Sequence, residues 1–155
     1  MPEINFSHLY DEIAHFKQLP NLIDEVSIEK FKGVYGSAEA GNSKNVIYFL
    51  LSEKPIPRLV GESRIIYIGL TKNSFKTRRY KDSKLHATSK ANNLKYSAII
   101  KNYGAISVKV CEYAKYGQTL EQAEGQFLWW YFQTHCEYPP VNYTQTKVRN
   151  DVVKT

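Results

Sequence analysis

The sequence contains few cysteines and no long hydrophobic run. Its two cysteines, Cys111 and Cys136, lack the spacing of a metal site or of a disulfide framework, so we expect both to be small core residues in a reducing compartment. No run of about 18 apolar residues and no charged leader followed by an apolar stretch is present, which excludes a transmembrane helix and gives no sign of secretion. These absences favour a cytoplasmic protein.

The composition indicates one folded domain. Of the 155 residues, 43% are hydrophobic and 14% are aromatic, which is too apolar for a disordered chain and enough to bury a core without disulfides or metals. No segment is rich enough in proline, glycine or serine to act as a linker. We therefore expect residues 1–44 to form an accessory segment packed on a domain of residues 45–155.

Positive charge is concentrated in one segment. Residues 72–101 contain nine lysines and arginines against the single acid Asp82, whereas the whole chain has a net charge of +6. Tyrosines and His86 are interleaved with these cations. The pattern favours a polyanionic partner such as nucleic acid, and a solvated helical face is the alternative.

Three apolar segments have the composition of β-strands. Residues 45–51 and 65–68 are nearly continuous in branched and aromatic side chains, and residues 106–110 alternate between apolar and polar ones. The segment between the first two, 52–63, contains prolines and a glycine and is predicted to be a loop joining an antiparallel pair.

Helical spacing of apolar residues predicts helices at 6–18, 92–103 and 118–135. The rest of the N-terminal segment is less regular: residues 28–35 are predicted to form a short strand or an irregular cover, and residues 36–44 a polar loop. Together the elements predict a small α/β (α+β) domain, with a three-stranded antiparallel sheet flanked by helices and an N-terminal helical extension.

The strand at 65–68 leads into a basic helix. Gly69 ends the strand, and Asn73 or Ser74 can cap the helix that follows. Cations beside a helix N-terminus favour a phosphate, because the free backbone amides and the macrodipole add to the side-chain charge. An ordinary strand–helix unit with a solvated basic face is the alternative.

Glu124 lies on the apolar face of the last predicted helix, with Leu120 and Phe127. A carboxylate on a core-facing stripe costs desolvation energy unless a cation or hydrogen bonds compensate it. Two interpretations follow: an ion pair with Arg78 or a lysine, or a metal ligand at the rim of a phosphate site.

Five landmarks in this order resemble those of the GIY-YIG endonuclease family, over about residues 45–145. They are Val46-Ile47-Tyr48 on the first strand, Tyr67-Ile68-Gly69 on the second, Arg78 on the basic helix, Glu124, and Asn142 in the segment Pro139-Pro140-Val141-Asn142. Five landmarks are far more specific than the second motif alone.

The sequence also departs from the family pattern. Val46 stands where the family usually has glycine, and Asp82 stands where many members carry a histidine. His86, two turns after the arginine, is a candidate for that histidine's role. Gly33-Val34-Tyr35 matches the first motif literally, but it lies far upstream and no strong apolar strand follows it, so we interpret it as a coincidence.

The resemblance implies a divalent-metal-dependent endonuclease that hydrolyses DNA phosphodiester bonds, of restriction or phage type. Glu124 would hold Mg²⁺ or Mn²⁺, and Arg78 would grip the phosphoryl oxygens. Tyr48, with Tyr67 beside it, would act as the base or orient the attacking water. Asn142 would fix the geometry of the site.

The proton acceptor is left open between Tyr48, His86 and a lysine such as Lys76 or Lys84. An ordinary tyrosine titrates near pH 10, so a basic Tyr48 would need nearby cations to lower its pKa.

Seven cations of the basic segment are predicted to contact DNA: Lys72, Lys76, Arg79, Lys81, Lys84, Lys90 and Lys95. Cutting both strands commonly needs two active sites, so a homodimer is favoured, and the aromatic run 129–132 could serve an interface or a buried core. The alternatives in function are a catalytically silent nucleic-acid-binding module with the nuclease fold and a regulatory partner-binding protein.

Overall fold

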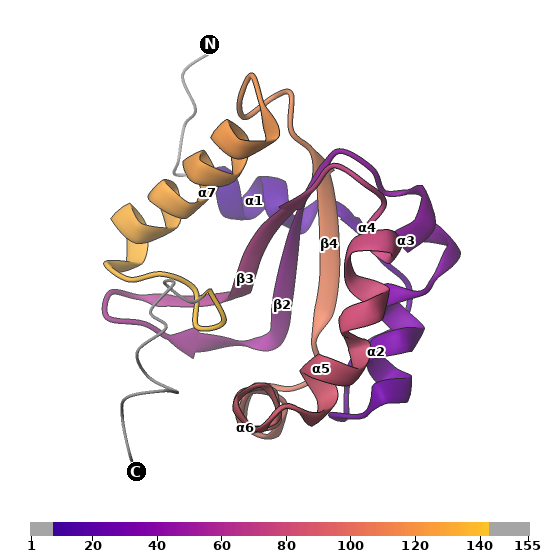
Figure 1. Ribbon diagram of the computed structural model, residues 1–155. Coiled ribbons are helices and arrows are strands. Elements are labelled where there is room, and N and C mark those ends of the chain that lie inside the picture. The colour runs from indigo at the N-terminus through magenta and orange to yellow at the C-terminus, as the bar shows by residue number, and fades with distance from the viewer. Residues whose placement is uncertain (1–7, 143–155) are drawn as a thin grey trace, which may run out of the picture.

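Two long strands, β2 (Val46–Pro57) and β3 (Glu62–Thr71), form the centre of the fold (Figure 1). The computed structural model describes residues 8–142. The two strands pair antiparallel, with Tyr48 opposite Gly69. Branched and aromatic side chains favour this pairing because they pack well on a pleated surface.

The predicted loop at 52–63 is wrong, because most of it continues the strands. After register shifts the pairing resumes, with Ile56 opposite Ser63. The Arg58 amide donates to the Gly61 carbonyl at 2.9 Å, and Gly61 has a φ of 69°, which favours glycine. Pro55 is tolerated because it lies where the ladder is interrupted by the register shift, and Pro57 is tolerated because it is the last residue of β2.

The sheet has four antiparallel strands in the order β1-β4-β2-β3. Strand β4 (Ser107–Glu112) pairs with β2 and matches the third predicted strand. Strand β1 (Lys17–Gln18) was not predicted, since two residues leave no periodicity to detect. Because β1 comes from the segment 1–44, that segment contributes to the sheet itself.

The helices include the three predicted from periodicity, at α1 (Leu9–Ala14), α6 (Lys90–Tyr103) and α7 (Leu120–His135). The predicted starting residues Phe6 and Ser7 lie outside the described residues. The other helical elements are α2 (Ile28–Tyr35), α3 (Ala38–Asn42), α4 (Phe75–Arg79), a 3₁₀ turn (Tyr80–Asp82) and α5 (Ser83–Thr88). Of these, α4 is the predicted basic helix, and Ser74 caps it by accepting a hydrogen bond from the Thr77 amide at 3.0 Å. Within residues 8–142 no helix is long and apolar enough to cross a membrane.

Two N-terminal predictions are corrected. Residues 28–35 form the helix α2, which Ser27 caps by accepting a hydrogen bond from the Lys30 amide at 3.2 Å. The predicted loop 36–44 contains the helix α3, capped in the same way by Ser37. Both helices are short, so caps and tertiary packing stabilise them more than intrinsic helix propensity does. Their sequences are too short to show a clear helical period.

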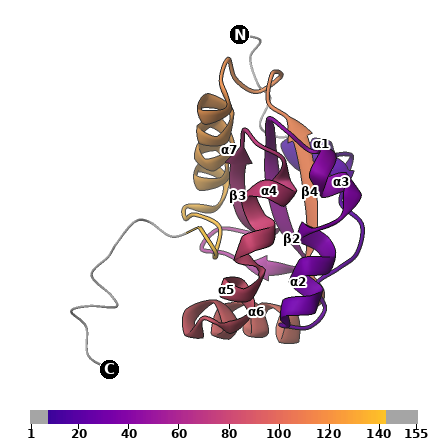
Figure 2. The same ribbon diagram turned by 45° about the vertical axis from the view of Figure 1, so that its right-hand side comes forward.

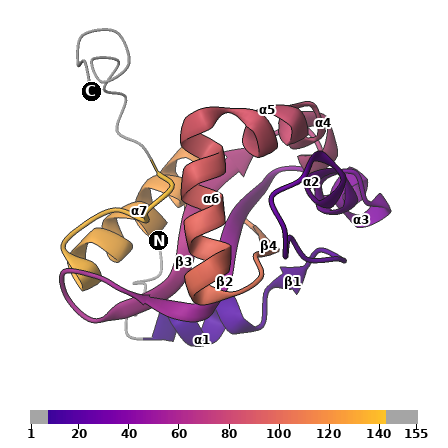
Figure 3. The ribbon, with the colours of Figure 1, turned by 90° about the horizontal axis from the view of Figure 1, so that it is seen from below.

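Side chains alternate along β2, so the sheet has a core on each face. Tyr48 and Leu50 pack on one face with residues of α2, α5 and α6. Ile47 and Phe49 pack on the other face with residues of α1 and α7. Figure 2 shows α7 on one side of the sheet and α2 on the other, and Figure 3 shows α6 crossing β2.

A buried polar network ties α1 and α7 to the β2–β3 hairpin. The Tyr10 hydroxyl lies 2.6 Å from Ser63 Oγ and 2.5 Å from His135 Nε2. His135 Nδ1 lies 2.8 Å from the Val60 carbonyl oxygen. Burial raises the pKa of Tyr10, so its hydroxyl stays protonated and bridges the three elements.

The aromatic run on α7 is divided between core and surface. Trp130 and Tyr131 are buried, whereas Trp129 is 54% exposed and its ring stacks on Phe132 at 6.0 Å between centroids. The core interpretation therefore holds for Trp130 and Tyr131.

The cysteine prediction is wrong for Cys136. Cys111 is half-buried, but Cys136 is exposed. It ends α7 with a φ of 59°, the left-handed conformation common at helix C-termini.

The rings of Tyr48 and Tyr67 leave no room for a side chain at position 69. A Cβ at Gly69 would lie 2.5 Å from Tyr48 Cζ and 2.7 Å from Tyr67 Cε1. Because both rings are held by the sheet, we expect Gly69→Ala to lower the free energy of unfolding by about 1–3 kcal/mol, measured by urea denaturation.

Gly125→Ala is the matched control. A Cβ at Gly125, inside α7, would have no neighbour within 4 Å. We expect this change to stabilise the protein by about 0.5–1 kcal/mol through helix propensity. Equal effects of the two substitutions would contradict the packing described for Gly69.

Candidate functional site

Two tyrosines and one arginine form a hydrogen-bonded cluster on the sheet. Tyr48 on β2 and Tyr67 on β3 face the same side, and their rings lie 5.8 Å apart with an interplanar angle of 26°. Arg79 Nε donates to the Tyr48 hydroxyl at 2.7 Å, and Nη2 donates to the Tyr67 hydroxyl at 3.0 Å. Nη2 also donates to the Tyr48 hydroxyl. The guanidinium therefore joins the two strands through their tyrosines.

The arginine at the tyrosines is Arg79 and not the predicted Arg78. Arg79 closes α4, its side chain is only 12% exposed, and Nη1 lies 3.4 Å from Asp82 Oδ2. Arg78 is exposed. Adjacent side chains of a helix point about 100° apart. Choosing the neighbouring residue of α4 therefore selects the exposed arginine in place of the buried one.

Burial makes Tyr48 a poor base. The pKa of Tyr48 is raised by burial, an effect that the nearby Arg79 charge only partly offsets. At neutral pH the hydroxyl is therefore protonated. It accepts hydrogen bonds from Arg79 and is suited to orienting a ligand.

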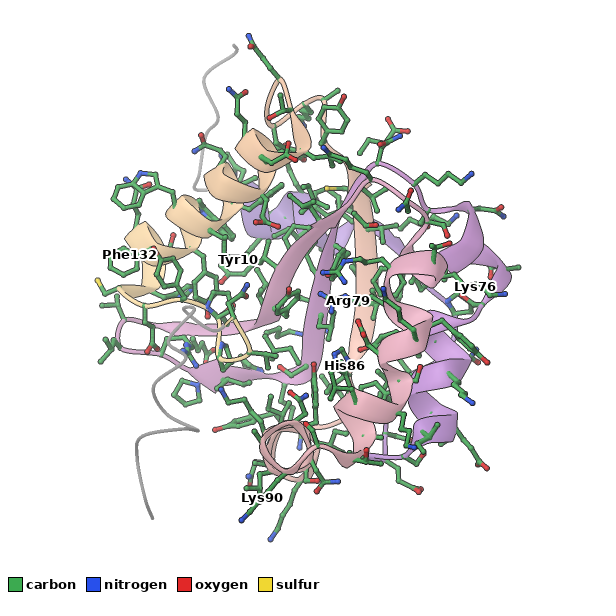
Figure 4. The ribbon with its side chains drawn as sticks, viewed as in Figure 1. Tyr10, Lys76, Arg79, His86, Lys90 and Phe132 are labelled. Carbon is green, nitrogen blue, oxygen red and sulfur yellow. The ribbon has the colours of Figure 1, made fainter. Side chains whose placement is uncertain are left out.

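His86 lies in the same cavity as the cluster. The cavity has a volume of about 250 Å³. Its walls are formed by residues from both strands and the covering helices: Tyr35, Tyr48, Leu50, Tyr67, Phe75, Arg79, His86, Asn92, Tyr96 and Val141. Figure 4 shows Arg79 and His86 in front of the sheet, beside α4 and α5.

His86 is neutral at physiological pH. Burial, helped by the Arg79 charge and opposed by Asp82, lowers the pKa of His86 to about 4. Its Nδ1 lies 2.9 Å from the Tyr35 hydroxyl. A neutral imidazole can accept a proton, so His86 is a candidate base from within the cavity.

Asn142 closes the outer edge of β3. Its Nδ2 donates to the Ile68 carbonyl and its Oδ1 accepts from the Ile68 amide, both at 2.9 Å. The preceding Val141 amide donates to the Ile66 carbonyl at 2.8 Å. Asn142 therefore holds β3 between Tyr67 and Gly69, and its contact with the site runs through the backbone.

Glu124 is not among the residues that line the cavity. It is half-buried on α7, whose buried residues pack on the opposite face of the sheet. Burial, and then the Glu121 charge, raises the pKa of Glu124. Among residues 8–142 its carboxylate has no hydrogen-bond or ion-pair partner, so the predicted pairing with Arg78 or a lysine is not formed.

At Glu124 the described part of the protein offers a metal ion a single carboxylate. Residues 8–142 contain no group of three or more His, Cys, Asp or Glu side chains able to hold a metal. This carboxylate supplies only one of the oxygen ligands that a divalent ion needs, so waters and substrate would have to supply the others. Of the common ions, Mg²⁺ suits a single carboxylate because it retains several waters.

The predicted DNA-contacting cations differ in their partners. Lys72 Nζ lies 3.4 Å from Glu121 Oε1, and Lys95 Nζ donates to the Pro140 carbonyl at 2.7 Å. Four other lysines are exposed and form no ion pair within the described part of the chain: Lys76, Lys81, Lys84 and Lys90. They lie on or beside α4, α5 and α6, the elements that wall the cavity, and Figure 4 labels two of them.

Sequence reasoning missed three cavity residues that carry a polar group, Tyr35, Asn92 and Tyr96. Tyr35 belongs to Gly33-Val34-Tyr35, which lies on the helix α2 and not on a strand. The interpretation of that motif as coincidental agrees with this helical conformation. The helical spacing of Phe31, Val34 and Tyr35 was the available signal for burial.

The depressed pKa of His86 predicts acid sensitivity. The unfolded chain takes up a proton on this histidine near pH 6.5, whereas the folded protein takes it up only near pH 4. The free energy of unfolding should therefore fall as the pH is lowered from 6.5 to 4, by up to about 3 kcal/mol from this group.

His86→Gln should remove this contribution and flatten the pH profile of urea unfolding between pH 7 and 4. The control is His15→Gln, because His15 is exposed and should leave the profile unchanged. Identical profiles for His86→Gln and the wild type would contradict the assignment.

The chain was also compared with known proteins. No protein-family model, no curated protein and no solved structure matches it. The site is therefore interpreted from its own geometry and from the motifs in its sequence.

Proposed function

We propose that this protein is a divalent-metal-dependent endonuclease that hydrolyses DNA phosphodiester bonds. The observation that carries the proposal is the Arg79 guanidinium, 12% exposed and held at a cavity by the hydroxyls of Tyr48 and Tyr67. The three residues come from the strands and the helix on which the GIY-YIG resemblance rests.

Arg79 would bind the phosphoryl group. Asp82 is its one carboxylate partner within residues 8–142, at 3.4 Å from Nη1, and an entering phosphate would compete with this carboxylate for the guanidinium. Planar parallel N–H donors match phosphoryl oxygens, and in a site of reduced water access they stabilise charge that develops in the transition state. Tyr48 and Tyr67 fix the orientation of the guanidinium.

His86 is the favoured proton acceptor for the attacking water. It is neutral at pH 7, and a bound phosphate would raise its pKa toward neutrality, because an adjacent negative charge favours imidazolium. Tyr48 is less suitable because burial raises its pKa.

Glu124 would hold the divalent ion. When bound, Mg²⁺ or Mn²⁺ supplies positive charge that neutralises phosphoryl oxygens and assists the leaving group. Its half-buried carboxylate has no partner among residues 8–142 and is therefore open to a cation. Because Glu124 does not line the cavity with Arg79, the ion would have to reach the phosphate from outside that cavity.

The exposed lysines beside the cavity would guide the DNA backbone. Lys76, Lys81 and Lys84 carry unpaired charge on the helices around Arg79. Such contacts give affinity without sequence preference and make binding depend on salt.

A catalytically silent DNA-binding module is the second candidate. It is favoured by the position of Glu124, which lies on a helix of the opposite face and does not line the cavity. A module of this kind would use Arg79 and the lysines for binding alone.

Plasmid cleavage distinguishes the candidates. With supercoiled plasmid and Mg²⁺ or Mn²⁺, we expect wild-type protein to nick DNA and EDTA to stop it. Arg79→Ala should slow nicking about 100-fold or more, since it removes charge stabilisation, and Glu124→Ala should abolish the metal-dependent rate. Circular dichroism checks that each variant is folded.

Arg78→Ala is the matched control for Arg79→Ala. Arg78 is the exposed neighbour in the same helix, so its loss should change the rate only a few-fold. Salt-dependent binding without any cleavage would support the silent module. Absence of salt-dependent binding would refute both candidates and favour a regulatory protein.

A further inference from the structure

We propose that the cavity beside Arg79 receives a single nucleobase turned out of the helix, so that the preferred substrate is DNA with an unpaired nucleotide. The proposal rests on the proposed function, because it assumes that Arg79 binds the DNA phosphate. It adds what the rest of the cavity binds.

The size of the cavity fits one base. Its volume is about 250 Å³, the space of about eight water molecules at about 30 Å³ each. A phosphate group alone leaves much of this space empty, and a stacked base pair cannot enter it. A purine or pyrimidine ring is flat and compact enough to fill it.

The walls away from Arg79 are those of an aromatic slot. Tyr35, Phe75 and Tyr96 line the cavity together with the aliphatic Leu50 and Val141. These five side chains are at most 5% exposed and form the floor of the cavity, which offers nothing to a phosphate or a metal ion. The half-buried rings of Tyr67 and His86 at the same cavity present surface on which a base can stack.

Asn92 gives the slot a polar group without a partner. It lies in the first turn of α6, where its backbone amide donates to Ser89 Oγ at 3.3 Å. Its half-buried side-chain amide lines the cavity and has no hydrogen-bond partner among residues 8–142. A carboxamide offers one donor edge and one acceptor, the pair that matches the edge of a base, adenine in particular.

The arrangement can hold one nucleotide at both ends. Arg79 offers cationic donors to the phosphate, and Asn92 offers an amide to the base. Turning a base out of a duplex costs stacking and pairing energy, which an unpaired base does not require. A site of this kind therefore selects bulged or frayed DNA over paired DNA.

Binding to three otherwise identical duplexes tests the proposal. One is fully paired, one carries a single bulged adenine, and one carries an abasic residue at the bulge. By fluorescence polarisation without metal, we expect the bulged duplex to bind at least tenfold tighter than the paired one. The abasic bulge should lose most of this advantage, because bending alone cannot fill the slot.

Asn92→Ala should reduce the preference for the bulged adenine about tenfold and leave affinity for the paired duplex unchanged. Asn102→Ala is the control, because Asn102 lies on the same helix with its side chain bonded to the Ala98 carbonyl at 2.9 Å. It should keep the preference.

Equal, salt-dependent affinity for the three duplexes would overturn the base slot and leave the proposed nuclease function standing. Equal binding of the adenine and abasic bulges would also overturn it, since flexibility alone would then explain the preference. No binding to any duplex would overturn both proposals. Persistent cleavage with no bulge preference would overturn the slot alone.

Discussion

The burial of one guanidinium constrains much of this structure. The Arg79 side chain is only 12% exposed, and its hydrogen-bond donors reach tyrosines on two different strands. A buried cation is costly unless its donors are met, so the register that places Tyr48 and Tyr67 side by side is coupled to the position of α4. Gly69 is part of the same constraint, because only a residue without a side chain leaves room for the Tyr48 ring.

The parts of the site come from distant stretches of the chain and are held by backbone contacts. α4 is anchored by Ser74, which caps the helix and is itself buried. The Phe75 amide donates to the Ser43 carbonyl at 2.9 Å, which ties the helix to the N-terminal segment. That segment also supplies Tyr35, the partner of His86. The first 44 residues therefore complete the cavity as well as the sheet.

Long, strongly patterned elements could be predicted from the sequence, whereas of the short helices only α4 was predicted, from its cap Ser74 and the strand before it. The strands around Tyr48 and Tyr67 and the helix that carries Glu124 have enough apolar residues for their period to be visible. The helices α2, α3 and α5 depend on caps and on contacts that the sequence does not reveal. The same limit explains the confusion of Arg78 with Arg79, since the orientation of a five-residue helix is set by its packing. The cavity could not be predicted either, because part of its wall comes from α2 and α6, which are distant in sequence from the two strand motifs.

The closure of β3 by Asn142 also affects how copies of this chain can associate. An open strand edge is a template for a neighbouring strand. Here the Ile66 and Ile68 backbone groups on the outer edge of β3 are already bonded to Val141 and Asn142, and the opposite edge of the sheet is the two-residue β1. Within residues 8–142, the middle of the β3 edge is therefore closed to a neighbouring strand, and β1 is too short to pair with one over any length. Side-chain surfaces on the helices, such as the exposed ring of Trp129, are the better candidates for self-association.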